Sequence, residues 1–265
     1  MSFNKYSPLL IFTLSIINGF FYLLFFEYFV YADASQFDLI AQNILKGYFS
    51  LSLESPYLPT MDREPVYPLF LSIIYKIFGY NHISVYLIQI FIFSLISLLT
   101  YYLAKNIFNQ RVALISGLIV ALLPTLANYT TFILSELFFT FFLICTIFFL
   151  QISFKKNNKY LFFISGLTLG LSVLIKAYML LFIVMIIIYM IFRYYKVKIN
   201  FLLNSFILIS GFLFIISIWS YRNFHKFDTF QLSGRGGLTL WMAADQLDDS
   251  YSLILKNIVF NFSEY

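Results

Sequence analysis

The sequence predicts an all-α fold: a polytopic bundle of transmembrane helices. Only 11% of the residues are charged and 61% are hydrophobic, whereas a soluble domain carries about 25% charged residues. The hydrophobic residues gather in long blocks, and an α-helix of about 20 such residues crosses a bilayer. Because lipid cannot satisfy open backbone groups, these blocks should be helical. The single cysteine excludes an internal disulfide framework or a cysteine-based metal site.

Seven apolar blocks are interpreted as spans of one transmembrane domain that covers residues 1–265. The first follows Lys5 as a signal peptide would, but it exceeds the usual apolar length of such peptides, so a retained span is favoured over cleavage. A long loop at residues 31–83 and a C-terminal segment at residues 221–265 lie outside the spans. The predicted spans are residues 7–30, 84–104, 112–128, 132–153, 161–176, 178–192 and 201–220.

The placement of lysine and arginine predicts the orientation. With the N-terminus inside, nine basic residues and no acid lie in the inner connections, and all 12 acids lie outside or at outer span ends. Positive charge marks cytoplasmic loops, so we expect a multi-pass plasma-membrane protein whose loop 31–83 and segment 221–265 are extracytoplasmic. The placement of the basic residues therefore follows the membrane orientation, and the net charge of +5 does not indicate nucleic-acid binding. The inner basic residues are Lys5, Lys105, Arg111, Lys155, Lys156, Lys159, Arg193, Lys196 and Lys198.

Two short helices are expected within the loop 31–83. Residues 34–45 place apolar side chains at helical spacing, with Asp38 on the opposite, polar side, and Gly47 ends the pattern. Residues 66–78 form a second apolar helix that begins after Pro65 and is ended by Gly79. Tyrosine and lysine side chains suit the membrane interface, where we expect both helices to lie.

Asp33, Glu136 and Lys176 are candidate functional residues. Asp33 follows the first span, and it is equally consistent with a helix cap and with a catalytic base. Glu136 lies near the outer end of an apolar span, where a carboxylate needs a polar cavity or a partner unless it reaches the surface. Lys176 joins two apolar blocks and also needs a partner, such as Glu136 or a bound anion.

Three cations point to an anionic ligand at the outer surface: Arg63, Lys176 and Arg222. Guanidinium and ammonium groups bind phosphate, so a lipid phosphate is a reasonable guest. We expect the ends of Lys176 and Arg222 to lie within about 10 Å of each other. The alternative role of Arg222 is interfacial anchoring beside Trp219. The two histidines are isolated, without metal-ligand spacing, and are interpreted as structural.

The motifs in this order resemble the dolichyl-phosphate-mannose–protein mannosyltransferase family of membrane glycosyltransferases, which have the GT-C fold. The resemblance extends roughly from Asp33 to Trp241. It lies in DASQFDLIAQNIL, DREPVYPLFLSIIYKIFG, LLPTLANYTTFILSELFFTFFL, ISGLTLGLSVLIKAYMLL and WSYRNFHKF followed by GRGGLTLW.

This resemblance implies an inverting transfer of a sugar from a polyprenyl-phosphate donor to an acceptor hydroxyl. No cofactor or metal is implied, and the acceptor stays unknown. The implied catalytic residues are Asp33 as general base, Glu64 and Glu136. The donor phosphate would be bound by Arg63, Lys176 and Arg222, and the substrate by Tyr67 and Asn223.

The sequence departs from the family pattern in two ways. Ile218 stands where a proline usually precedes the tryptophan, and family members are commonly much longer, which implies a truncated member or one part of a split enzyme. Two alternatives stay open: a non-catalytic partner of a glycosyltransferase and a transporter of lipid-linked glycans. A transporter would place charges deep in the membrane on both sides, and the purely basic inner side favours the enzyme.

Overall fold

A computed structural model describes residues 3–26, 30, 32–195 and 201–234. Within these ranges the chain is helical and holds no strand beyond an isolated bridge between Ser50 and Pro59. The helices are α1 (Phe3–Phe25), α2 (Asp33–Leu45), α3 (Val66–Phe78), α4 (His82–Ile107), α5 (Gln110–Ala121), α6 (Pro124–Asn128), η1 (Tyr129–Thr131), α7 (Glu136–Lys156), α8 (Lys159–Val173), η2 (Ala177–Leu181), α9 (Phe182–Tyr195) and α10 (Phe201–Phe227).

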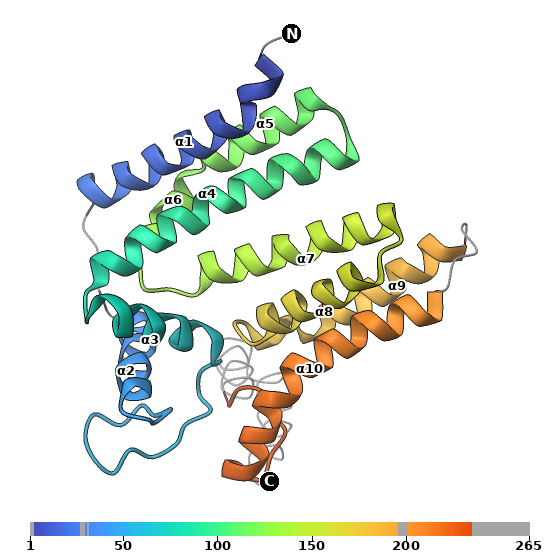
Figure 1. Cartoon of the computed structure of the whole chain (residues 1–265). Helices are drawn as coiled ribbons and strands as arrows, with labels where there is room; N and C mark the ends of the chain where they lie inside the picture. The colour runs from blue at the N-terminus through green and yellow to red at the C-terminus, as the bar shows by residue number, and fades with distance from the viewer. Residues whose placement is uncertain (1–2, 27–29, 31, 196–200, 235–265) are drawn as a thin grey trace, which may run out of the picture.

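The long helices form two groups that share a direction (Figure 1). In the first group α1, α4 and α5 pack against one another, and in the second α8 packs between α7 and α10. The contact between α4 and α7 joins the groups. The short helices α2 and α3 pack together at one end of the bundle, at the lower left of Figure 1. This arrangement confirms the predicted all-α, polytopic helical class.

In the part of the chain that the structure describes, four helices are long and apolar enough to cross a membrane: α1, α4, α7 and α10. The pair α5 and α6 with η1 is bent by 47° and makes a fifth candidate if it counts as one span. The helices α8 and α9 are apolar but shorter. Seven spans would require both of them to cross, and that number stays a prediction.

Several helix boundaries differ from the predicted spans. The expected span 112–128 is broken after Ala121, and Pro124 begins α6 because proline suits the first turn of a helix. The expected span 132–153 begins only at Glu136, since the preceding residues form η1 and an extended segment. The last span continues beyond residue 220 to Phe227. The ends of the first span and of segment 221–265 lie partly outside the described residues.

Glycines bring α8 and α10 into backbone contact. A Cβ atom added at Gly166 would lie 2.1 Å from the carbonyl oxygen of Leu208, and one at Gly211 would lie 2.4 Å from that of Phe163. Small residues at such crossings let transmembrane helices approach closely and gain van der Waals contact. This crossing fixes the relative position of the helices that carry Lys176 and Arg222 at their ends.

The helix α2 differs from the amphipathic helix that the sequence predicts. Its bounds agree with the expected 34–45 to within one residue, but Asp38 is buried instead of lying on a polar face. The phenol groups of Tyr75 and Tyr80 donate hydrogen bonds to its carboxylate, and His82 Nε2 lies 3.2 Å from it. Because α3 and the start of α4 supply these polar groups, a carboxylate can be buried at the shared interface.

Candidate active site

The loop of residues 60–65, here called the hub loop, precedes α3 and lies against the segments that follow α8 and α10, at one end of the second helix group. The backbone N–H of Val66, just after it, donates to the carbonyl of Leu174 over 3.3 Å. The N–H of Gly234 donates to the carbonyl of Met61 over 2.9 Å. Pro65 removes one donor and favours the start of α3 at the next residue. Charged side chains from segments that are far apart in the sequence therefore lie near this loop.

Arg63 is the buried cation of the hub loop. Its guanidinium forms a bidentate ion pair with the carboxylate of Asp33 at the start of α2, and its Nε donates to Gln36 over 2.9 Å. The ring of Phe37 lies beneath it, 4.7 Å from the guanidinium carbon. The side chain of Arg63 is 6% exposed and that of Asp33 is 51% exposed. The pair therefore has a buried cation and an accessible anion.

The capping position of α2 belongs to Ala32, which makes no side-chain cap. Asp33 is instead the first helical residue, and its carboxylate faces Arg63. A negative charge there is also favoured by the helix dipole. This geometry places Asp33 in a charge pair and leaves the base role as a proposal.

Lys176 pairs with Glu136, as the sequence predicts for a lone cation between apolar blocks. Lys176 Nζ donates to Glu136 Oε1 over 2.9 Å, joining the end of α8 to the start of α7. The next residue, Ala177, donates its N–H to Glu64 Oε1 over 3.3 Å. The hub loop thus contacts the segment that carries Lys176, and the Asp33–Arg63 and Glu136–Lys176 pairs belong to one constellation.

The start of α7 holds two polar atoms without a partner. Among the described residues, Glu136 Oε2 and Ser135 Oγ are buried and make no hydrogen bond. Buried polar groups are normally satisfied, and each orphan costs about 1–3 kcal/mol. Hydroxyl groups of a polar ligand would satisfy both atoms.

Arg222 and Asn223 hold the opposite side of the hub loop. Arg222 Nη1 donates to the carbonyl of Thr60 over 2.8 Å and to Asn223 Oδ1 over 2.8 Å, and its guanidinium lies over the ring of Trp219. Asn223 is buried, and its amide donates to the carbonyl of Gln231 over 2.7 Å. The predicted proximity of Lys176 and Arg222 stays a prediction, since their own contacts lead to different partners.

Tyr67 lies in the core instead of facing the hub loop. Its hydroxyl donates to Gln89 over 2.8 Å, and its ring packs edge-on against Phe37. The Gln89 amide donates in turn to the carbonyls of Thr130 and Phe132. In this conformation Tyr67 supports α3 against α4 and η1.

A cavity of about 360 Å³ adjoins the exposed side of Asp33. Three further polar side chains of its lining come from the bent segment that contains α6 and η1: Thr125, Asn128 and Tyr129. Its apolar lining includes Phe132 and Leu134. Pockets of roughly 300–1,000 Å³ hold small molecules in proteins. The carboxylate of Asp33 is therefore within a space that admits a small polar compound.

The cluster around Asp38 is the feature that sequence reasoning missed. Asp38 comes from α2, Tyr75 from α3, Tyr80 from the connection between α3 and α4, and His82 from the start of α4. Burial and the hydrogen bond to Asp38 raise the pKa of Tyr80 to about 12. The cluster joins α2, α3 and the start of α4. Within the described part of the chain, no group of three or more histidine, cysteine, aspartate or glutamate residues could hold a metal ion.

The chain matches the family model described as dolichyl-phosphate-mannose-protein mannosyltransferase over residues 62–221. No curated protein and no solved structure matches it. The matched range begins in the hub loop and ends at the last turns of α10, so it contains Arg63, Glu64, Glu136 and Lys176. The chain therefore belongs to the dolichyl-phosphate-mannose–protein mannosyltransferase family, a family of membrane glycosyltransferases of the mannosyltransferase type.

Proposed function

We propose that the chain is the membrane core of an inverting glycosyltransferase that takes a hexose from a polyprenyl-phosphate donor. The acceptor is a hydroxyl group on the extracytoplasmic side. The observation that carries this proposal is the meeting of Asp33, Arg63, Glu64, Glu136 and Lys176 around the hub loop. The constellation offers cations for a phosphate, a half-exposed carboxylate for a hydroxyl proton and orphaned acceptors for sugar hydroxyls.

The donor phosphate would bind two cations that carboxylates neutralise in this structure. Arg63 and Lys176 each pair with a carboxylate here, and a phosphate provides more acceptor oxygens in a similar place. A phosphate that drew Arg63 away would leave the Asp33 carboxylate without its partner at the moment when a base is needed. Donor binding and activation of the base would thus be one event.

The reaction follows from that arrangement. The acceptor oxygen attacks the anomeric carbon, the bond between that carbon and the phosphate oxygen breaks, and polyprenyl phosphate leaves with the electron pair. Asp33 accepts the hydroxyl proton. Preorganised cations stabilise the charge that develops on the leaving phosphate. Attack from the side opposite the phosphate inverts the anomeric centre.

The sugar and the acceptor would occupy different sides of the hub loop. Glu136 Oε2 and Ser135 Oγ supply the unsatisfied acceptors that sugar hydroxyls require, beside the Lys176 ammonium. The cavity that adjoins Asp33 suits the acceptor, because Thr125, Asn128 and Tyr129 offer hydroxyl and amide groups. Both assignments leave the reacting hydroxyl near the half-exposed carboxylate of Asp33.

The proposal is tested with polyprenyl-phosphate mannose as the first donor. The purified chain in lipid nanodiscs is titrated with the donor, and release of polyprenyl phosphate is followed after a hydroxyl acceptor is added. Lys176→Ala should weaken donor binding by about tenfold or more, since a charge-assisted hydrogen bond is worth about 1.5–3 kcal/mol. Lys226→Ala is the control, because Lys226 is a cation that is exposed in the last turn of α10. Equal donor binding by both variants would refute the phosphate site.

A further inference from the structure

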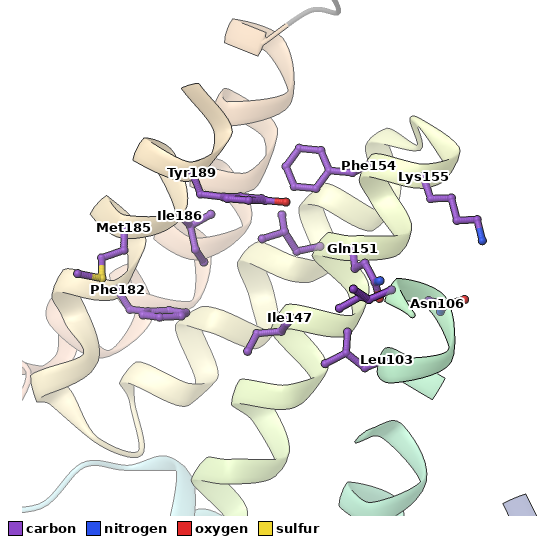
Figure 2. Close-up of a pocket in the computed structure, with 12 residues that line it drawn as sticks. Leu103, Asn106, Ile147, Gln151, Phe154, Lys155, Phe182, Met185, Ile186 and Tyr189 are labelled. Carbon is purple, nitrogen blue, oxygen red and sulfur yellow. The ribbon is translucent and has the colours of Figure 1, made fainter. Parts of the chain in front are cut away.

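A larger cavity, of about 690 Å³, lies between α4, α7 and α9 (Figure 2). It is distinct from the candidate active site. The helix α7 begins at Glu136, and with a rise of about 1.5 Å per residue its Gln151 lies roughly 22 Å further along the bundle. This is the end at which Lys105, Lys155 and Lys156 are exposed. One end of the cavity therefore lies at the basic side of the membrane domain.

The polar groups of this cavity follow an order along α7. Gln151 lies one helical turn deeper along α7 than Lys155, Asn106 lines the cavity from the last turn of α4, and the remaining lining is apolar or aromatic. Figure 2 shows Gln151 between α7 and α4, with Phe182 and Ile186 of α9 facing it across the space. From the basic end inward, a ligand would meet a cation, then an amide, then a hydrocarbon wall.

Gln151 supplies the second observation that points to a ligand. Its Oε1 atom is buried and has no hydrogen-bond partner in the part of the chain that the structure describes. An amide in an apolar span is costly unless it is satisfied. A ligand hydroxyl could donate a hydrogen bond to Gln151 Oε1 in its present orientation. If the side-chain amide rotated by 180°, its NH₂ group would take that position and could donate to an ester carbonyl.

We propose that this cavity binds an anionic phospholipid of the leaflet on the basic side, with one acyl chain inserted between α7 and α9. The order of groups in the cavity matches that of such a lipid, which presents a phosphate, a glycerol ester and a hydrocarbon chain. Lys155 would contact the phosphate, and Gln151 the glycerol region about 6 Å deeper, one turn along the helix. Basic pockets between transmembrane helices on the cytoplasmic side bind anionic headgroups.

The tail of the polyprenyl donor fits the same cavity less well. A prenyl phosphate carries hydrocarbon directly below its phosphate and has neither an ester carbonyl nor a glycerol hydroxyl. It would fill the apolar part and leave the Gln151 amide unsatisfied. The amide therefore favours a glycerophospholipid over a prenyl lipid.

The test compares lipid binding to the purified chain by native mass spectrometry. Phosphatidylglycerol and phosphatidylcholine with identical acyl chains are titrated, and polyprenyl phosphate is used as a competitor. The wild type should prefer phosphatidylglycerol. Lys155→Gln should weaken its binding about fivefold, the effect expected of one interfacial cation. Ile147→Trp, which puts a larger ring into the apolar part of the cavity, should weaken binding of both lipids. The matched control is Lys156→Gln, an exposed lysine on the same helix that does not line the cavity.

Three results would overturn the proposal. Equal binding of both phospholipids to the wild type would remove the headgroup argument without need of any variant. Equal losses of phosphatidylglycerol binding in Lys155→Gln and Lys156→Gln would assign the effect to the overall positive charge of this end of the bundle and not to a contact of Lys155. Displacement of phosphatidylglycerol by polyprenyl phosphate, with no effect of Gln151→Leu on either lipid, would make the occupant a prenyl chain.

Discussion

The crossing of α8 and α10 allows the sharpest prediction about stability. In Gly166→Ala the new Cβ would lie 2.1 Å from the Leu208 oxygen and 2.8 Å from the Phe212 nitrogen, whereas ordinary contacts begin at 3.4 Å. Both neighbours are backbone atoms, so no side chain can turn away and the helices must separate by about 1 Å. Overpacking of this kind costs about 1–3 kcal/mol, and the better helix propensity of alanine returns about 1 kcal/mol. The expected net loss of unfolding free energy is therefore up to about 2 kcal/mol.

The assay for this prediction is equilibrium unfolding in mixed micelles with increasing sodium dodecyl sulfate, followed by circular dichroism. The matched control is Gly117→Ala, where Cβ of Tyr101 would lie at 3.0 Å and the nearest atom, at 2.5 Å, is Cδ1 of Ile11, the end of a flexible side chain. This side chain can rotate, so the control should lose much less stability. A Gly166→Ala protein as stable as Gly117→Ala would refute the backbone contact. Because α8 and α10 lead to Lys176 and Arg222, weakened donor binding should accompany the loss of stability.

Two further predictions concern the loop 31–83. A cysteine introduced at the exposed Ser55 should react with an impermeant thiol reagent in intact cells, and the native Cys145 should not react because it is buried. Labelling only after lysis would place the loop on the cytoplasmic side. Tyr80 has a pKa raised from 10.0 to about 12 in the folded state, so its contribution to stability is present below pH 10 and is lost as the pH rises toward 12. Tyr80→Phe should make the free energy of unfolding fall less steeply between pH 10 and pH 12. An unchanged slope of this free energy against pH would contradict the hydrogen bond to Asp38.

Local patterns predicted the short helices and one ion pair. Pro65 and Gly79 bound α3 as expected, since proline favours a helix start and glycine an end. The Lys176–Glu136 pair was predictable because each charge lies among apolar residues and few partners exist at that depth.

Contacts between distant segments could not be read from such patterns. Asp33 and Arg63 are 30 positions apart, and a residue at a helix start is consistent with several roles until its partner is seen. Asp38 has helical spacing that indicates a polar face, but the tyrosines that bury it belong to other elements. The break in the span at residues 112–128 had a local signal, Pro124, although an apolar run across it favoured one continuous helix.

The role of Asp33 as general base is the central claim, and turnover by Asp33→Asn tests it most directly. Asparagine keeps the shape but cannot accept the proton, so turnover of polyprenyl-phosphate mannose should fall by about 10²–10⁴-fold. Donor binding by this variant, measured in the same preparation, should persist because Arg63 and Lys176 are unchanged. The control is Glu54→Gln, which removes an exposed carboxylate of the same loop and should leave full activity. An Asp33→Asn protein that binds the donor and turns it over at the wild-type rate would contradict the account.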